Sequence, residues 1–333
     1  MNRIINAEDD PDDLTPPFFE SDAAIKRFVV PDQVWGERLD KHLALCMPEH
    51  SRGRLQGWIE QGHVQVNGQP QAKVRYRVSA GDVLSVQPQP GEETLAFGPE
   101  NVDFEVVAQS EQWMVINKPV GLVVHPGAGN WGGTLLNGLL MSDPALAAVP
   151  RAGIVHRLDK DTSGLMVVAR TITAQTSLVR QLQARRVHRE YVALCHGHVQ
   201  AARLTIDQSI GRDARAPVKM TVQRPVAPKE AITHVNCQRQ GLLEGQRVSE
   251  VICQLETGRT HQIRVHLSSL GHPLLGDTLY GGRTLGSADR QMLHARKLSF
   301  EDPDTGQTQT FECAMHEDMS AVMDQIEWLE RVK

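Results

Sequence analysis

The densest group of reactive side chains lies in the segment GIVHRLDKDTSG, residues 153–164, which runs into the apolar stretch LMVVAR. Asp159, Asp161 and Ser163 have the spacing that opens an EF-hand calcium loop, but its twelfth position needs a bidentate glutamate and is Arg170 here. Calcium binding is therefore excluded. The segment is then either a polar turn that caps backbone donors before a buried strand, or a loop that presents a catalytic carboxylate.

Two later segments each add one residue that could take part in chemistry. REYVALCHGHV contains Tyr191, and HQIRVHLSSLG contains Arg264. Taken singly, an ordinary strand tyrosine and an ordinary helix arginine are the simpler interpretations. His261 and His266 do not follow the H-E-x-x-H zinc pattern and lack a third ligand, so we expect no metal.

A glycine-rich segment supports only a weak alternative. Gly127, Gly129 and Gly132 fit the pattern G-x-G-x-x-G, but Pro126 precedes them and no parallel βαβ unit is evident. A nucleotide-dependent enzyme is therefore a minor hypothesis. The five cysteines form no C-x-x-C pair, which argues against both a disulfide framework and a structural zinc site.

The segment HRLDKDTSGL resembles the active-site motif of the RluA-type pseudouridine synthases, in which the acid after Arg-Leu is catalytic. The resemblance covers roughly residues 103–300 and places that role on Asp159 rather than Asp161. It also implies that Tyr191 stacks against the target base and that Arg264 pairs with the catalytic aspartate. The motifs look closest to the synthase D branch, which acts on uridines in the helix 69 stem-loop of large-subunit ribosomal RNA.

Three more residues are predicted to bind RNA through the same resemblance. EQWMVINKPVGLVVHPGAGN supplies the family's early Lys-Pro segment at Lys118, and His156 and Arg157 precede the catalytic acid. In the resembling family the arginine of HRLD enters the RNA in place of the flipped base, which puts this role on Arg157. A uridine within a stem cannot expose its sugar, so the target must be flipped out or lie in a loop.

Pseudouridine formation breaks a glycosidic bond, rotates the uracil and rejoins it through carbon, so neither a cofactor nor a metal is required. One carboxylate near the sugar suffices, either as a nucleophile or as a base that leads to a glycal, and the residues do not choose between these routes. A fixed cation at Arg264 would favour the ionised carboxylate of Asp159 and fix its orientation. Stacking on Tyr191 would contribute about 1–3 kcal/mol.

The apolar patterning predicts an α+β protein with a largely antiparallel mixed sheet flanked by helices. Expected strands include VDFEVVAQ, WMVINKP, GLMVVAR, REYVALCHGHV and VSEVICQLETG, and expected helices include TLLNGLLM, AQTSLVRQLQAR and HQIRVHLSSLG. We predict a disordered acidic tail at 1–24, a small α/β RNA-binding domain at 25–86, a linker at 87–100 and the catalytic domain at 101–333. The segment around 200–235 carries no recognisable motif.

The small domain resembles the RNA-binding domain named after ribosomal small-subunit protein four, through RLDKHL, SRGRLQGWI, HVQVNG and GDVL. Arg52 and Arg54 lie in the first turn of a predicted helix capped by Ser51, where anions are favoured. Lys73 and Arg75 are expected to alternate with Arg77 along one face of the extended segment KVRYR. These basic residues are predicted to contact RNA phosphates.

The distribution of charge along the chain is compatible with an enzyme that acts on RNA. The net charge is −5, but residues 1–24 contribute −6 of it, and residues 151–224 carry thirteen basic against five acidic residues. No run of about 18 apolar residues exists and no signal peptide is evident, so we expect a cytoplasmic monomer that acts on ribosomal RNA or the pre-ribosomal large subunit. The alternatives are another ribosomal or transfer RNA site, or a catalytically silent RNA-binding assembly factor.

Overall fold

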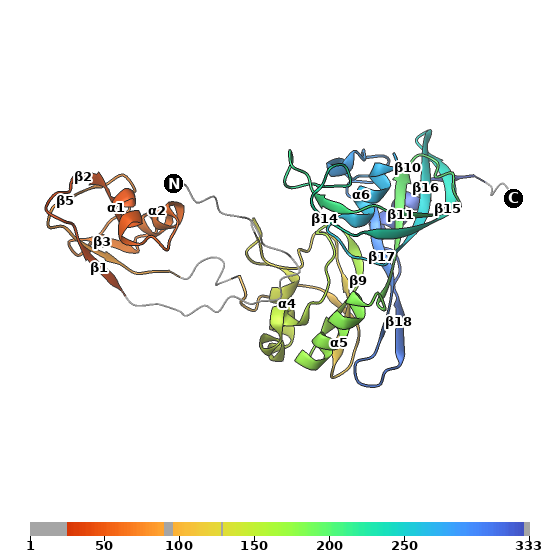
Figure 1. The fold of residues 1–333 in the computed structure, drawn as a ribbon, viewed down its shortest axis with the longest axis horizontal. Coiled ribbons are helices and arrows are strands. Elements are labelled where there is room, and N and C mark those ends of the chain that lie inside the picture. The colour runs from red at the N-terminus through yellow and green to blue at the C-terminus, as the bar shows by residue number, and fades with distance from the viewer. Residues whose placement is uncertain (1–24, 90–95, 128, 330–333) are drawn as a thin grey trace. The chain divides into compact units, whose positions relative to one another are not determined.

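A computed structural model describes residues 25–89, 96–127 and 129–329. The chain divides between Ala96 and Phe97 into two compact units, each with its own hydrophobic core (Figure 1). The acidic tail predicted at 1–24 and the middle of the predicted linker lie outside the described residues.

The first unit packs two helices against short strands. Ser51 caps α2, because its hydroxyl accepts a hydrogen bond of 3.3 Å from the backbone N–H of Arg54, as predicted. Asn67 and Gly68 both have positive φ at the tight turn between β3 and β4. The helices and strands are α1 (Leu39–Cys46), α2 (Arg52–Glu60), β1 (Lys26–Val29), β2 (Trp35–Arg38), β3 (Val64–Val66), β4 (Gln69–Pro70), β5 (Arg77–Ser79) and β6 (Val83–Val86).

The prediction that KVRYR is an extended segment is wrong for most of its length. A turn is closed by a hydrogen bond of 2.9 Å from the N–H of Tyr76 to the carbonyl oxygen of Lys73, and only Arg77 lies in a strand. The basic residues therefore do not alternate along one strand face. All three side chains are nevertheless exposed, since Lys73 and Arg75 project from the turn and Arg77 from β5.

The second unit is built on a ten-stranded sheet, in the order β11-β15-β16-β10-β17-β9-β8-β7, with β18 paired to β17 and β19 to β15. Its strands are β7 (Glu105–Gln109), β8 (Trp113–Lys118), β9 (Ser163–Ala169), β10 (His188–His196), β11 (Arg203–Asp207), β15 (Ile232–Leu243), β16 (Gln246–Leu255), β17 (Leu293–Glu301), β18 (Thr308–Glu312) and β19 (Glu327–Trp328). Every described pairing in it is antiparallel except that of β9 with β17, so the predicted α+β class with a largely antiparallel sheet is confirmed.

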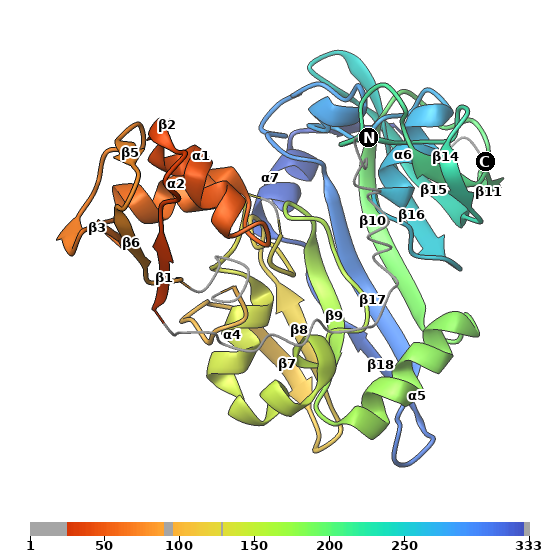
Figure 2. The ribbon, with the colours of Figure 1, turned by 60° about the vertical axis from the view of Figure 1, so that its left-hand side comes forward.

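Helices cover both faces of this sheet (Figure 2). On one face, α4 and α6 pack against Met166 of β9 and Tyr191 of β10. On the other face, α5 packs against Val167 and α7 packs against Val192. The helices are α4 (Leu135–Ser142), α5 (Ile172–Gln183), α6 (Gln262–Ser269) and α7 (Glu317–Asp324), with short 3-10 turns η1 (Pro144–Ala148), η2 (Pro150–Gly153) and η3 (Thr278–Tyr280).

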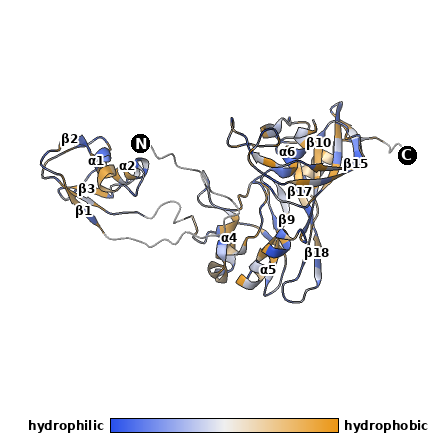
Figure 3. Ribbon diagram, in the orientation of Figure 1, coloured by the Kyte–Doolittle hydropathy of each residue, from blue (hydrophilic) through white to orange (hydrophobic). Residues whose placement is uncertain are grey.

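This two-sided cover explains why LMVVAR reads as a continuous apolar run rather than an alternating one. Every residue of β9 is buried, because neighbouring side chains enter different cores. Figure 3 shows hydrophobic residues concentrated in the central strands, while α5 carries both hydrophobic and hydrophilic residues. The segment without a readable motif forms β11 together with a small separate sheet, whose strands are β12 (Ile210–Arg212), β13 (Met220–Thr221) and β14 (Val226–Lys229).

The parallel pairing of β9 with β17 depends on a glycine. Gly164 has a φ of +112°, and a Cβ added there would lie 2.3 Å from the carbonyl oxygen of Ala295. No side chain fits such an approach between two backbones. Gly164 therefore sets how closely the loop that holds Asp159 approaches β17.

We predict that Gly164→Ala lowers the free energy of unfolding by clearly more than the roughly 1–2 kcal/mol of a left-handed backbone alone. Gly245→Ala is the matched control, because Gly245 has a φ of +71° at the β15–β16 turn and no atom within 4 Å of the added Cβ. The measurement is the urea concentration at the unfolding midpoint of each variant, with tryptophan fluorescence as the signal. Equal shifts for the two variants would show that the contact with Ala295 has no influence.

Candidate active site

Asp159 lies in the loop between η2 and β9, at the edge of the face that carries α4 and α6. The loop is shaped by a turn in which the N–H of Thr162 donates to the carbonyl oxygen of Asp159 at 3.1 Å. Leu158 is buried in the core, so its neighbour Asp159 is held at the surface of that core with its side chain 17% exposed. The loop thus combines a fixed backbone with a carboxylate that solvent reaches.

Arg264 pairs with Asp159, as predicted. Its Nη1 donates to Asp159 Oδ2 at 2.9 Å. The rest of the guanidinium makes a two-pronged pair with Asp277, through Nε to Oδ2 at 2.7 Å and Nη2 to Oδ1 at 2.9 Å. Asp277 is 2% exposed, so this pair is desolvated and holds the guanidinium plane in one orientation.

The electrostatics of this group keep Arg264 charged. Burial alone would lower the pKa of Arg264, but the hydrogen bond to Asp277 and the charges of Asp159 and Asp277 raise it above its usual range. Burial lowers the pKa of His261, although the charge of Asp159 opposes this shift. The lowered pKa favours a neutral imidazole. His261 Nε2 lies 3.8 Å from Asp159 Oδ1, on the side away from Arg264's donor.

A tyrosine and a strained residue complete this cluster. Tyr280 OH lies 2.7 Å from His261 Nδ1 and accepts a hydrogen bond of 2.9 Å from the N–H of Met220. The Arg264 guanidinium carbon lies 5.0 Å from the centre of the Tyr280 ring. His261 itself has a φ of +56° at the start of α6, a costly conformation for a non-glycine residue that the surrounding contacts hold in place.

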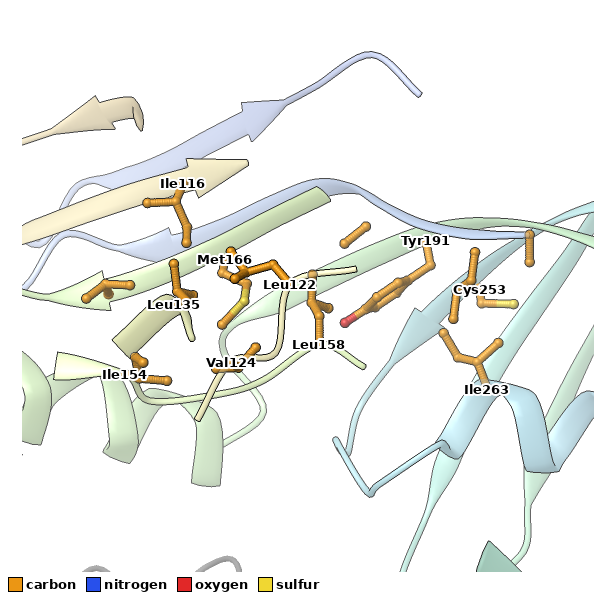
Figure 4. Packing of buried hydrophobic residues seen from close by; sticks show 14 of the residues in the cluster. Ile116, Leu122, Val124, Leu135, Ile154, Leu158, Met166, Tyr191, Cys253 and Ile263 are labelled. Carbon is orange, nitrogen blue, oxygen red and sulfur yellow. The ribbon is translucent and has the colours of Figure 1, made fainter. Parts of the chain in front are cut away.

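Tyr191 approaches the same site from β10. It is 5% exposed, and it belongs to the core cluster that also contains Leu158, Leu122 and Ile263. Figure 4 shows its ring between the strand side of the core and the chain around Leu158. Burial raises the pKa of Tyr191, with a smaller opposing effect of Arg189 and a further increase from Asp159, so its phenol is neutral.

The prediction that Lys118 binds RNA is corrected by its surroundings. Lys118 is fully buried, and its Nζ donates to three carbonyl oxygens, those of Pro119, Leu122 and Lys160, at 2.8–2.9 Å. Burial lowers the pKa of Lys118 to about 7, while the charges of Asp161 and Asp159 favour the ammonium form. Lys118 therefore holds the loop that contains Lys160 against the end of β8.

His156 and Arg157 have different environments. Arg157 is exposed next to the site, as an RNA contact requires. His156 Nε2 accepts a hydrogen bond of 3.1 Å from the N–H of Val167, and burial, with a contribution from Arg189, lowers the pKa of His156 to about 3. His156 is thus neutral and fixed beside β9.

The basic residues of the first unit are only partly free to contact phosphates. Arg52 donates to Asp40 at 2.8 Å, and Arg54 lies 5.5 Å above the Trp58 ring and donates to the carbonyl oxygen of Gln89. These contacts restrain both arginines on the surface of α2. Lys73 and Arg75 are exposed in the turn described above.

Sequence reasoning missed two functional residues, Asp277 and Tyr280. Both stand in the segment LLGDTLYGG, which follows HQIRVHLSSLG and whose individual side chains have no distinguishing pattern. The glycine-rich alternative loses its basis, because the carboxylate of Glu100 accepts the N–H of Gly133 at 2.9 Å and β8 pairs with β9 in antiparallel fashion. Within the described ranges, no group of three or more His, Cys, Asp or Glu is placed to hold a metal, and no helix is long and apolar enough to cross a membrane.

Comparisons with known proteins agree with this geometry. Residues 112–269 match the family described as RNA pseudouridylate synthase, and residues 37–84 match the S4 domain. The chain is 47% identical to ribosomal large subunit pseudouridine synthase D of Neisseria meningitidis serogroup B, over 87% of this chain and 79% of that protein. It is 43% identical to the protein of the same name from Nitrosomonas europaea, over 98% and 96%.

A solved structure shows the same relationship in three dimensions. Human RNA pseudouridylate synthase domain containing 1 superposes with a TM-score of 0.54 at 29% identity, covering 74% of this chain and 94% of that one. The chain thus contains the Asp159–Arg264 pair and a buried Tyr191, and its relatives are named as pseudouridine synthases. The chain belongs to the RNA pseudouridylate synthase family and is an RNA-modifying isomerase with an S4 domain.

Proposed function

We propose that this enzyme isomerises uridines in the helix 69 stem-loop of large-subunit ribosomal RNA, with Asp159 as its catalytic residue. The observation that carries the catalytic assignment is the carboxylate of Asp159, which is partly exposed and held at 2.9 Å by a buried guanidinium. The relatives named as ribosomal large subunit synthases support a substrate in large-subunit RNA. The narrower choice of helix 69 follows from the likeness of HRLDKDTSGL and HPGAGN to the synthase D branch.

The reaction breaks the bond between C1′ of the ribose and N1 of uracil, and the base leaves with the electron pair. Asp159 either attacks C1′ or removes the proton from C2′, and each route yields a detached uracil. The uracil rotates so that C5 bonds to C1′, while Asp159 leaves C1′ on the first route or returns the proton to C2′ on the second. C5 then loses its proton and N1 gains one. No atom is lost, so the side chains have to position, stabilise and move protons.

The remaining site residues have distinct tasks in this proposal. Arg264 orients Asp159, because the pair with Asp277 fixes the guanidinium that donates to it. The Tyr191 ring gives the detached uracil an apolar surface in a site from which most water is excluded. Arg157 is exposed next to Asp159 and enters the stack in place of the flipped base.

The first unit supplies affinity rather than sequence choice. Lys73 and Arg75 are exposed, while Arg52 and Arg54 lie at the start of α2, where an anion is favoured. Contacts of this kind fix the register of the RNA and depend strongly on salt. A monomeric, cytoplasmic enzyme remains our prediction.

We predict that Asp159→Asn abolishes pseudouridine formation, with a loss of at least about 10³-fold, because the neutral amide neither attacks nor removes a proton. Affinity for RNA should be unchanged. The measurement maps pseudouridine chemically in an unmodified helix 69 stem-loop and in whole large-subunit RNA. Asp161→Asn is the matched control and should stay active.

Four outcomes decide between the alternatives. If wild type modifies helix 69 positions and only Asp159→Asn loses this activity, both parts of the proposal are supported. Modification by wild type at other positions would move the target within ribosomal RNA, and activity on transfer RNA alone would reject the large-subunit assignment. Equal modification by Asp159→Asn would place catalysis on another residue.

We also predict that Asp277→Asn slows turnover on the order of 10²-fold while RNA affinity stays the same, because Arg264 loses the partner that orients it toward Asp159. Single-turnover rates and filter-binding affinities on the same RNA separate these effects. Asp289→Asn, at an exposed position of the same connection, should behave as wild type. A weaker affinity with an unchanged rate would make Asp277 part of the RNA-binding surface instead.

A further inference from the structure

Among the arginines that the structure describes in the second unit, three are almost completely buried, and one of these has no anionic partner among the described residues. Arg264 is 6% exposed and pairs with Asp159 and Asp277. Arg290 is 8% exposed and pairs with Asp318 at 2.6 Å, while it also donates to backbone carbonyl oxygens. Arg189 is equally buried, at 8%, yet its Nε has no hydrogen-bond partner and no carboxylate of the described residues pairs with it.

The place of Arg189 in the sheet puts it beside the active site. On β10, Arg189 pairs with Leu255 and Tyr191 pairs with Cys253, in continuous register with β16. Both side chains therefore project from the same sheet face, about 7 Å apart along the strand. Arg189 Nη1 lies against the loop before α6, where a Cβ on Gly258 would be only 2.5 Å away.

The surroundings of Arg189 are basic or neutral. Burial lowers the pKa of Arg189; Tyr191 opposes this shift and Arg259 adds to it, so a second guanidinium lies near. His156 is a second side chain of this unit with an unfilled donor. His156 Nε2 accepts from Val167, so its Nδ1 carries the proton, and this donor is buried without a partner as well.

Buried polar atoms are rarely left without a partner, and a buried charge even less often. In the described part of the chain, four buried side-chain atoms lack one, and two of these are Arg189 Nε and His156 Nδ1. Both are donors, and Arg189 lies on the strand that carries Tyr191. The unfilled donor of Arg189, on a group with a permanent positive charge, requires an acceptor that carries negative charge and arrives from outside.

We propose that Arg189, with the loop at Gly258 and Arg259, binds a phosphodiester of the RNA backbone next to the target uridine. RNA brings one such anion per nucleotide, and the guanidinium fork matches two of its oxygens. Gly258 leaves the space in which Arg189 reaches this loop. The inference rests on RNA as the substrate and not on the choice of helix 69.

The test compares Arg189→Met, Arg189→Lys and Arg186→Met with wild type. Arg186 precedes β10, is about half exposed and pairs with Glu301, so its loss removes the same charge from the surface. The probes are the unmodified helix 69 stem-loop and whole large-subunit RNA, with affinity measured over a range of salt. Unfolding midpoints are measured for each protein without RNA.

Arg189→Met should weaken RNA binding on the order of ten- to a hundredfold. It should also reduce the salt dependence of affinity, the slope of log K against log salt, by about 0.7. Without RNA the same variant should unfold at a higher midpoint than wild type, since an unpaired buried charge is replaced by an apolar chain. Arg189→Lys should keep the salt slope. Arg186→Met should change neither the affinity for RNA nor the salt slope.

Other results overturn the assignment in identifiable ways. A slower reaction with unchanged affinity and salt slope would assign Arg189 to the detached uracil, which is also an anion, and reject the phosphate. A lower unfolding midpoint with unchanged affinity would make Arg189 structural. If wild type modifies neither RNA, the proposed target has failed, but the affinity comparison among the variants still decides the role of Arg189.

Discussion

The catalytic unit depends on one buried cation shared by two carboxylates. Burying a guanidinium is costly unless its donors and its charge are matched, and Arg264 meets this condition only by touching both Asp159 and Asp277. The three residues come from the loop before β9, from α6 and from the loop after α6. The burial of Arg264 thus ties together segments more than a hundred residues apart and fixes the carboxylate that solvent reaches.

The site also divides its carboxylates by environment. Asp277 is almost fully enclosed and meets Arg264 with both oxygens, so its role is to orient. Asp159 uses one oxygen for Arg264 and keeps the other beside a neutral His261. The same cation therefore serves an enclosed pair and the carboxylate proposed to react, and the difference between them lies in access to solvent.

Most of the fold and the central pair could be predicted from the sequence. The strands around Tyr191 and the helix with Arg264 follow from apolar patterning, and their pairing with Asp159 follows from ordered motifs that resemble a family. Asp277 escaped prediction, because an acid in a loop has no distinguishing pattern until the fold brings Arg264 to it. Lys118 was misplaced for the opposite reason: a lysine in a conspicuous motif suggests RNA, whereas three backbone carbonyls hold it inside.

Local turn chemistry accounts for the other error. KVRYR alternates basic and other residues as a strand would, but the N–H of Tyr76 closes a turn onto Lys73 before the strand begins. Alternation over five residues is too short to exclude a turn, so tertiary contacts decide. The unpaired state of Arg189 was likewise invisible, since a sequence shows which residues are charged and not which of them lack a partner.

The position of β17 has a consequence for how the enzyme is made. This strand lies between β9 and β10 in the sheet, although it follows both in the chain by about a hundred residues or more. A ribosome synthesises Asp159, Tyr191 and Arg264 before it reaches Leu293, so the nascent chain carries two half-sheets with no strand between them. Long-range pairing of this kind closes slowly. The enzyme that modifies RNA therefore acquires its assembled site only at the end of its own translation.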